Sequence, residues 1–310
     1  MRFLIVGAGA LGGYFGARLL EAGKNVTFLL RPHRAAQLEG TGLIVRSRFG
    51  NLVLLKPPHV LAEDISTPFD VIIVGCKAYD LAQAMESFAP AVSADTVILP
   101  LLNGMRHLDD LTQRFGKKHV LGARCMISAT LDSDGAILHM NDTHELSFGE
   151  LNGSGSDRIN SLKAAFSNVR FEANASANIL QEMWEKWVFI AAAASITCLM
   201  RATVGDIVSV GAADMAEEIL DECGIIASQN GFQPSDAATK RARSILTTVG
   251  SSMTASMFKD IERGSPIEAD HIVGDLLGRA SKKTRDASAL IVAYTHLKAY
   301  EARREREATI

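Results

Sequence analysis

The sequence predicts an α/β fold in two parts: an N-terminal domain built on a doubly wound parallel sheet, followed by an all-α C-terminal domain. Short apolar runs alternate with helical patterns through the first part of the chain, and the pattern is helical almost throughout after residue 179. A chain of 310 residues is also too long for one domain of common size. We place the boundary after residue 176, so the expected domains span 1–176 and 177–310.

The first predicted element is a strand that enters a glycine-rich turn. The apolar run 3–6 is followed by Gly7, Gly9 and Gly12 at G-x-G-x-x-G spacing, and a helical pattern continues to Gly23. In this context the backbone can approach a pyrophosphate, which sits on the N–H groups of the helix N-terminus. The motif therefore predicts a Rossmann-type dinucleotide site. An ordinary turn and a signal peptide are the alternatives, and the early glycines disfavour the signal peptide because they interrupt its apolar stretch. The predicted cofactor-binding residues of this turn are Gly7, Gly9, Ala10, Leu11 and Gly12.

A second predicted strand, residues 26–30, ends on Arg31, and Arg34 follows closely. NAD-specific sites carry an Asp or Glu about twenty residues after the glycines, where it accepts a hydrogen bond from the ribose 2′-hydroxyl. Arg31 stands at that place. A guanidinium binds a 2′-phosphate through charge-assisted hydrogen bonds, whereas a carboxylate would repel it. Arg34 could add a second contact, and a solvated loop arginine is the alternative interpretation. We therefore expect NADP(H) rather than NAD(H).

The remaining α/β pattern places two polar residues at one edge of the predicted sheet. Buried-strand runs at 69–75 and 96–101 flank a helical stretch at 80–88, and a hairpin is predicted within 43–55. Lys77 and Asn103 each follow one of these strands, at the carboxyl ends where doubly wound sheets bind ligands. Loop lysines and Asn-Gly turns are also common structural features, so both interpretations stay open. Short strand-like pieces follow residue 121, and 151–157 has the composition of a flexible loop.

The predicted helical domain carries a lysine and two carboxylates in settings that allow chemistry. Lys186 lies on a helix that is otherwise almost wholly apolar, either at an edge with its amine in water or at a site. Glu268 and Asp270 begin the helix after Pro266, where carboxylates stabilise the helix N-terminus and catalysis is the alternative role. Glu268 and His271 have E-x-x-H spacing, but the chain has no second such motif, so no metal site is predicted.

Composition narrows the classes of function. The net charge is −3 and the chain has no long basic run, which disfavours nucleic acid as a partner. The four cysteines lie far apart without a C-x-x-C pair, so neither a disulfide framework nor a zinc site is indicated. The longest apolar run, 187–200, is shorter than the about twenty residues that span a bilayer. We expect a soluble, cytoplasmic enzyme that acts on a small molecule and does not associate with membranes.

A series of short motifs stands in order along the chain: GAGALG, LLR, CKAYD, LLNGM, WEKW, SMFKDIERGSPIEAD and LKAYEAR. Together they resemble the ketopantoate reductase (2-dehydropantoate 2-reductase) family, and the resemblance covers essentially the whole chain. It implies an N-terminal Rossmann domain, a helical C-terminal domain, and NADPH-dependent reduction of a 2-oxo acid in the cleft between them. The namesake reaction belongs to pantothenate biosynthesis. The resemblance also implies a homodimer formed through the helical domain.

The resemblance implies roles for individual residues. Lys186 matches the family's catalytic lysine, Glu268 its cleft glutamate, and Arg31 its 2′-phosphate arginine. An ammonium at the substrate carbonyl would stabilise and protonate the oxygen as negative charge develops, and a neighbouring carboxylate would keep the lysine charged. Further matches are Lys77 and Asn103 beside the nicotinamide and substrate, Ala129 at the cofactor, and Ser256 at the substrate.

Departures from the family pattern fall on substrate contacts. Members specific for ketopantoate carry asparagines one and two helical turns after the catalytic lysine, where this chain has Ile190 and Ala194. A third asparagine aligns with Met253. We therefore expect a 2-oxo acid more apolar than ketopantoate. Ketopantoate itself and a non-catalytic NADPH-binding sensor are the alternatives, and the retained lysine and glutamate disfavour the sensor. The expected substrate-binding residues are Asn103, Lys186, Ile190, Ala194 and Ser256.

Overall fold

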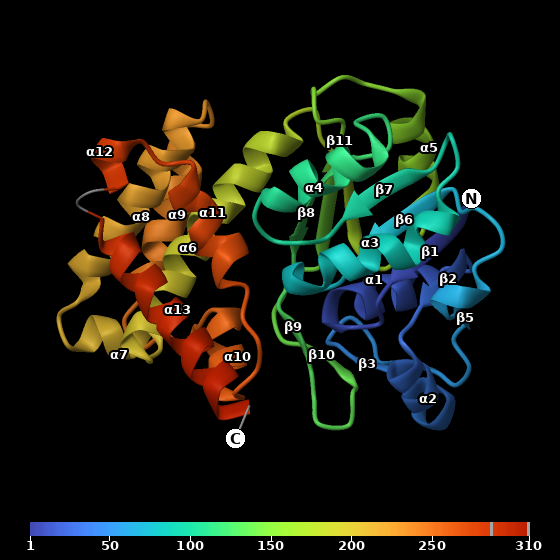
Figure 1. The fold of residues 1–310 in the computed structure, drawn as a ribbon, viewed down its shortest axis with the longest axis horizontal. Helices are drawn as coiled ribbons and strands as arrows, with labels where there is room; N and C mark the ends of the chain where they lie inside the picture. The colour runs from blue at the N-terminus through green and yellow to red at the C-terminus, as the bar shows by residue number, and fades with distance from the viewer. Residues whose placement is uncertain (286–287, 309–310) are drawn as a thin grey trace. The chain divides into compact units, whose positions relative to one another are not determined.

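The computed structural model describes residues 1–285 and 288–308, and the chain divides into two compact units. Unit 1 comprises Met1–Leu102 and His107–Leu180, and unit 2 comprises Asn103–Arg106 and Gln181–Ile310. The first is an α/β unit and the second is helical, which confirms the predicted fold class (Figure 1). The expected boundary after residue 176 lies a few residues before the observed one. The difference arises because Ile179 packs against Gly149 of unit 1, where an added Cβ would lie 3.1 Å from the Ile179 Cβ.

The main sheet of unit 1 is parallel and has the order β5-β2-β1-β6-β7. Strands β1, β6 and β7 are apolar and largely or fully buried, as expected for a sheet covered on both faces. Val6 pairs with both Leu29 and Val74, so the segments that follow β1, β2 and β6 begin at one edge of the sheet. The strands are β1 (Arg2–Val6), β2 (Asn25–Leu29), β5 (His59–Val60), β6 (Val71–Val74) and β7 (Val97–Pro100). The accompanying helices are α1 (Ala10–Glu21), α2 (Pro32–Thr41), α3 (Leu81–Phe88) and α4 (Arg106–Phe115), with 3₁₀ turns η1 (Ala62–Asp64), η2 (Ala78–Asp80) and η3 (Ala89–Ala91).

Two smaller sheets complete unit 1. Strands β3 (Leu43–Arg46) and β4 (Leu52–Leu54) pair antiparallel, which confirms the predicted hairpin. They join β10 (Ile137–His139) and β9 (Ala129–Leu131) in a sheet of order β4-β3-β10-β9. A third sheet, of order β12-β11-β8, contains β8 (Gly122–Met126), β11 (Glu145–Gly149) and β12 (Glu172–Ala175), and α5 (Asp157–Ala165) lies between the last two in the chain. The strand-like pieces after residue 121 are therefore strands.

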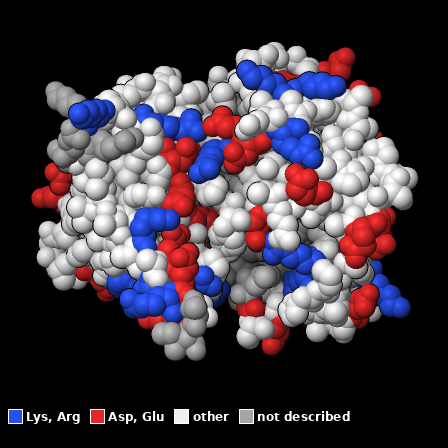
Figure 2. Space-filling view, in the orientation of Figure 1, with Lys and Arg blue, Asp and Glu red and all other residues white. Residues whose placement is uncertain are grey.

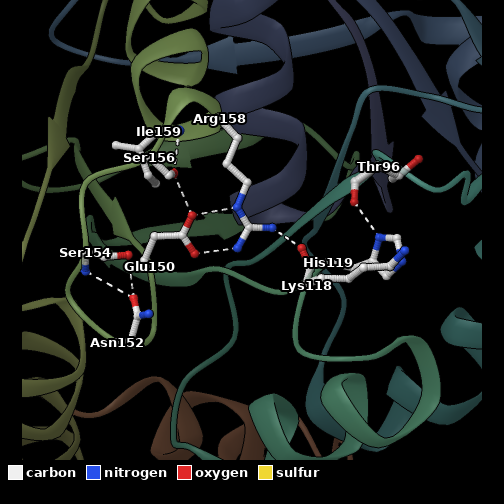
Figure 3. A network of polar contacts seen from close by, with 9 residues as sticks. All are labelled: Thr96, Lys118, His119, Glu150, Asn152, Ser154, Ser156, Arg158 and Ile159. Carbon is white, nitrogen blue, oxygen red and sulfur yellow. Dashed lines mark hydrogen bonds and ion pairs between the residues drawn. The ribbon is translucent and has the colours of Figure 1, made fainter.

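An ion pair anchors the loop that follows β11. Figure 3 shows the carboxylate of Glu150 facing the guanidinium of Arg158, whose Nε donates to Oε1 at 2.6 Å and whose Nη2 donates to Oε2. Ser156 Oγ donates to the same carboxylate at 2.7 Å, and Arg158 also donates to the carbonyl of Lys118. The hydrogen bonds from Arg158 hold the pKa of Glu150 below its ordinary value. The segment 151–157, which has a flexible composition, is thus fixed at both ends.

Unit 2 is built around the long helix α6 (Ile179–Met200). This helix is long and apolar enough to cross a membrane, but 67% of its most apolar window is buried inside the structure. Packing within a folded unit therefore accounts for its composition. Segments that contain glycine or proline, at 211, 231–234 and 264–266, lie between α7 and α8, between α8 and α9, and after α10. The other elements are α7 (Val204–Ser209), α8 (Ala213–Gln229), α9 (Asp236–Leu246), α10 (Ser256–Glu262), the π-helix η4 (Asp270–Gly274), α11 (Asp275–Gly278), α12 (Lys282–Arg285) and α13 (Ala289–Ala308).

Acidic and basic side chains of the described residues are interspersed over the face of the molecule drawn in Figure 2. Many of the charged side chains are paired, for example Arg114 with Glu86 and Arg243 with Asp221. Exposed pairs of this kind contribute little to stability, typically less than about 1 kcal/mol each. Their mixed distribution agrees with the small net charge of −3.

Candidate functional site

The three glycines of the turn after β1 have different surroundings. Gly7 has φ +89°, a left-handed conformation that L-residues rarely adopt. A Cβ on Gly12 would lie 2.3 Å from the Gly7 carbonyl oxygen, so the absence of a side chain lets α1 pack closely on the strand. A Cβ on Gly9 would meet no heavy atom of the described residues within 4 Å, and Gly9 is the N-cap of α1 without a side chain to bind the first-turn N–H groups. Open space beside an uncapped helix N-terminus fits a pyrophosphate.

Arg31 lies where the sequence places it, directly after β2 and at the N-cap of α2. Its Nη2 donates to Asp80 Oδ1 at 2.8 Å and to Gln83 Oε1 at 2.9 Å. The Asp80 hydrogen bond raises the pKa of Arg31 above its ordinary value. The side chain is 59% exposed, so it remains accessible to an anion at the same sheet edge as the glycine turn.

Arg34, which the sequence offers as a second phosphate contact, binds backbone carbonyls of unit 1. Its Nε and Nη2 donate to the Ala8 carbonyl at 3.1 and 2.9 Å, and Nη2 also donates to the Gly135 carbonyl at 3.0 Å. Burial lowers the pKa of Arg34 from its ordinary value. Arg34 therefore connects the glycine turn to the β9–β10 turn, and most of its donors are used within the protein.

Two further cofactor candidates belong to unit 1. Lys77 is half-buried, follows β6, and is the N-cap of η2, so its backbone lies at the same sheet edge as Gly7. Ala129 is half-buried and begins β9, which packs against α1. Both positions are compatible with the expected cofactor contacts.

A buried junction in unit 2 joins three segments that carry candidate residues. Trp187 is fully buried on α6, and its Nε1 donates to the Ile272 carbonyl of η4 at 2.9 Å. Gly104 has φ +80°, and an added Cβ would lie 2.7 Å from the His271 carbonyl oxygen. The turn of residues 103–106, the helix α6 and the η4 segment therefore meet at this point.

The candidate polar residues flank this junction in the sequence. Asn103 precedes Gly104 and Lys186 precedes Trp187; both are half-buried. Glu268 lies shortly before η4 and is 8% exposed. The segments that carry the Asn103 amide, the Lys186 amine and the Glu268 carboxylate therefore lie in one unit, although they are far apart in the sequence.

The helix expected after Pro266 contains a π-helical segment, η4, directly after Ala269 and continues as α11. A Cβ on Gly274 would lie 2.9 Å from the Tyr294 ring, and Trp187 donates a hydrogen bond to the carbonyl of Ile272. Tyr294 and Trp187 therefore both contact the π-helical segment. Tyr294 Oη donates to Asp270 Oδ1 at 2.7 Å. Burial acts to raise the pKa of Asp270, but hydrogen bonds from Tyr294 and Lys298 outweigh it and lower the pKa. Short π-helical turns occur frequently at functional sites.

The expected substrate residues have unequal exposure. Ser256 begins α10 and is exposed, and the preceding Ala255 N–H donates to Thr197 Oγ1 of α6 at 3.3 Å. Ile190 is half-buried, one turn after Lys186 on α6. Ala194 is 3% exposed and is packed into the interior of unit 2. Of the two residues that replace family asparagines on α6, Ile190 is therefore the one with accessible surface.

Sequence reasoning did not single out Asp80, Gln83, Trp187 or Tyr294. Asp80 is part of the motif CKAYD, and a carboxylate in that motif was the available signal. Trp187 and Tyr294 act through tertiary hydrogen bonds that no local pattern indicates. Within residues 1–285 and 288–308, no group of three or more His, Cys, Asp or Glu side chains is arranged to hold a metal ion.

Two family models match most of the chain. The model described as "Ketopantoate reductase PanE/ApbA" matches residues 3–153, and "Ketopantoate reductase PanE/ApbA C terminal" matches residues 178–301. The chain is 38% identical over 303 residues to the uncharacterized oxidoreductase YkpB of Bacillus subtilis (strain 168), covering 97% of this chain and 99% of the relative. It is 24% identical to the 2-dehydropantoate 2-reductase of a Nostoc species, covering 97% and 96% of the two chains.

Solved structures share the fold over nearly the full length. The 2-dehydropantoate 2-reductase of Methylococcus capsulatus superposes with a TM-score of 0.85 at 25% identity, covering 98% of each chain. A D-mandelate dehydrogenase solved with NADH and anilino(oxo)acetate superposes with a TM-score of 0.87 at 20% identity, covering 98% of this chain and 100% of that one. At that identity the second likeness concerns the fold alone.

Proposed function

Because the chain belongs to the ketopantoate reductase family, we propose that it is an NADPH-dependent oxidoreductase that reduces a 2-oxo acid to a 2-hydroxy acid. The observation that carries the proposal is the junction in unit 2, where the helix of Lys186 and the segment of Glu268 are joined by the Trp187–Ile272 hydrogen bond. A half-buried amine and a buried carboxylate are the groups that carbonyl reduction needs for proton transfer. Unit 1 adds the open glycine turn that a dinucleotide needs.

The N-terminus of α1 would hold the pyrophosphate of a nicotinamide cofactor, and Arg31 would hold its 2′-phosphate. When bound, this cofactor would supply the hydride for the substrate carbonyl carbon. The ammonium of Lys186 donates a hydrogen bond to the carbonyl oxygen, stabilises the negative charge that develops there, and transfers a proton to it. Glu268 has two candidate roles: it keeps Lys186 charged and oriented, or it accepts a hydrogen bond from a substrate hydroxyl.

The substrate in this proposal is more apolar than ketopantoate. Ile190 lies one turn after Lys186, on the same face of α6, and its side chain offers no hydrogen bond. Burying a substrate hydroxyl unpaired beside it would cost about 1–3 kcal/mol. That cost corresponds to a loss of roughly ten- to a hundredfold in specificity. Asn103 and Ser256 remain the proposed polar contacts.

True 2-dehydropantoate 2-reductase activity, in pantothenate biosynthesis, is the second candidate. It is favoured by relatives of that name that align with 97% of this chain. A non-catalytic NADPH-binding sensor is disfavoured by the joint presence of Lys186 and Glu268. We also propose a homodimer, since a ketopantoate reductase of the same fold from Staphylococcus aureus is described as dimeric. A cytoplasmic location is a separate part of the proposal.

The test is NADPH oxidation by the purified full chain against a panel of 2-oxo acids, including ketopantoate and its analogue without the hydroxyl. A higher kcat/KM for the analogue supports the apolar pocket, and Ile190→Asn should then shift the preference toward ketopantoate. A clear preference of the parent chain for ketopantoate overturns the apolar pocket and establishes the second candidate. NADPH binding without turnover of any 2-oxo acid leaves the sensor as the remaining candidate.

A further inference from the structure

The guanidinium of Arg31 is held by a carboxylate that the proposed reaction does not use. Nη2 of Arg31 donates to Asp80 Oδ1 at 2.8 Å and to Gln83 Oε1 at 2.9 Å. Arg31 follows β2, whereas Asp80 and Gln83 follow β6, and these two strands flank β1 in the sheet. The contact therefore spans the end of β1, next to the glycine turn.

The contact leaves Arg31 able to bind an anion. It uses Nη2, so the Nε and Nη1 donors make no hydrogen bond to the described residues, and the side chain is 59% exposed. The backbone of Arg31 is fixed because it is the N-cap of α2 and is followed by Pro32. A 2′-phosphate bound to these donors would lie close to the Asp80 carboxylate.

A carboxylate in this place has two opposite effects on a phosphorylated cofactor. It positions Arg31, which favours binding, and it repels a phosphate of charge near −2, which disfavours binding. Gln83 accepts from the same Nη2 without carrying a charge, so Arg31 keeps an acceptor when the charge of Asp80 is removed. An asparagine at position 80 would also still accept. Removing the charge of Asp80 should therefore leave Arg31 largely in position, but it should remove the repulsion between Asp80 and the phosphate.

We propose that Asp80 is a specificity-determining residue of the cofactor site that weakens NADP(H) binding and narrows the preference over NAD(H). With NAD(H), the carboxylate accepts a hydrogen bond from the ribose 2′-hydroxyl, the interaction that an Asp or Glu after the second strand makes in NAD-specific sites. The inference rests on the proposed dinucleotide-dependent function and refines its cofactor choice. The site then binds NADPH more tightly than NADH, but by a smaller margin than Arg31 alone would give.

The test is Asp80→Asn in the full chain, titrated with NADPH and with NADH in the absence of substrate and followed by cofactor fluorescence. The Kd for NADPH should fall about tenfold, or about 1.4 kcal/mol, which lies between the energies of a fully hydrated and of a protein-surface pair of unit charges at contact distance. The Kd for NADH should stay unchanged or rise. Glu86→Gln is the matched control because Glu86 lies on the adjoining helix α3, is 70% exposed, and pairs with Arg114 instead of Arg31. This control should change either Kd by less than about twofold, since exposed distant charges are screened.

Weaker NADPH binding by Asp80→Asn would overturn the inference and make Asp80 a positioning residue for Arg31. Equal tightening by Asp80→Asn and Glu86→Gln would also overturn it, because overall charge would then explain the effect. In both cases the proposed function would stand. A parent chain that binds neither dinucleotide would refute the proposed function and the inference together. Retained NADH binding by Asp80→Asn shows that the variant is folded.

Discussion

Replacing Gly104 with alanine should loosen the junction between the Asn103 turn and the segment after Glu268. Gly104 has φ +80°, where an L-residue costs about 1–2 kcal/mol. The added Cβ would also lie 2.7 Å from the His271 carbonyl oxygen, nearer than a carbon can approach without movement of the backbone. Overpacking of this kind adds about 1–3 kcal/mol. The free energy of unfolding should therefore fall by about 2–5 kcal/mol, the sum of the two terms.

Gly116→Ala separates the two contributions. Gly116 has φ +89°, close to that of Gly104, but its added Cβ would meet no heavy atom of the described residues within 4 Å. In this variant the free energy of unfolding should fall only by the cost of the positive φ for an alanine, about 1–2 kcal/mol. Urea unfolding followed by circular dichroism measures both variants, and the difference between them isolates the contact with His271.

The two variants should also differ in activity. Because Asn103 precedes Gly104, a displaced turn should lower kcat with a 2-oxo acid in Gly104→Ala and leave kcat near the parent value in Gly116→Ala. Equal losses of stability together with equal kcat values would refute the reasoning that the His271 carbonyl constrains this turn.

Three further predictions concern the cofactor, the proton donor and acid stability. Arg31→Ala should weaken NADPH binding by about 1.5–3 kcal/mol, one charge-assisted contact, and leave NADH binding nearly unchanged; titration that shows equal affinity of the parent chain for both cofactors would contradict this. Lys186→Ala should reduce turnover by about 10²-fold or more at unchanged NADPH affinity, and steady-state turnover near the parent rate would exclude Lys186 as proton donor. The pKa of Glu150 is depressed in the folded chain, so its pairing with Arg158 stabilises the fold above the ordinary carboxyl pKa and is lost as the pH falls through the folded value. Glu150→Gln should therefore lower stability near neutral pH by about 1.5–3 kcal/mol and flatten its acid decline in urea unfolding, and parallel pH curves for the two proteins would count against the ion pair.

The elements that position the site were readable from local sequence. A short run of β-branched apolar residues such as Val71–Val74 favours a strand buried on both faces of a sheet. The glycine spacing after β1 indicates a tight turn that lets a helix pack closely on the strand. The hairpin within 43–55 and the apolar helix at 179–200 were predictable for the same reason, since period and turn residues act over a few positions. The family motifs also indicated Lys186 and Glu268 as site residues, and the roles of both remain proposals.

Only the tertiary structure decided what those side chains contact. Two arginines that look alike in the sequence separate in the fold: Arg34 binds the carbonyls of Ala8 and Gly135, whereas Arg31 meets Asp80. Ala194 shares a helix face with Ile190 by spacing, yet packing buries it. A long side chain bonds to whichever acceptor the folded backbone brings within about 3 Å, and that acceptor can lie a hundred residues away in the chain. The periodicity of a helix or strand shows which of its residues share a face. It does not show which residues from other parts of the chain will pack against that face.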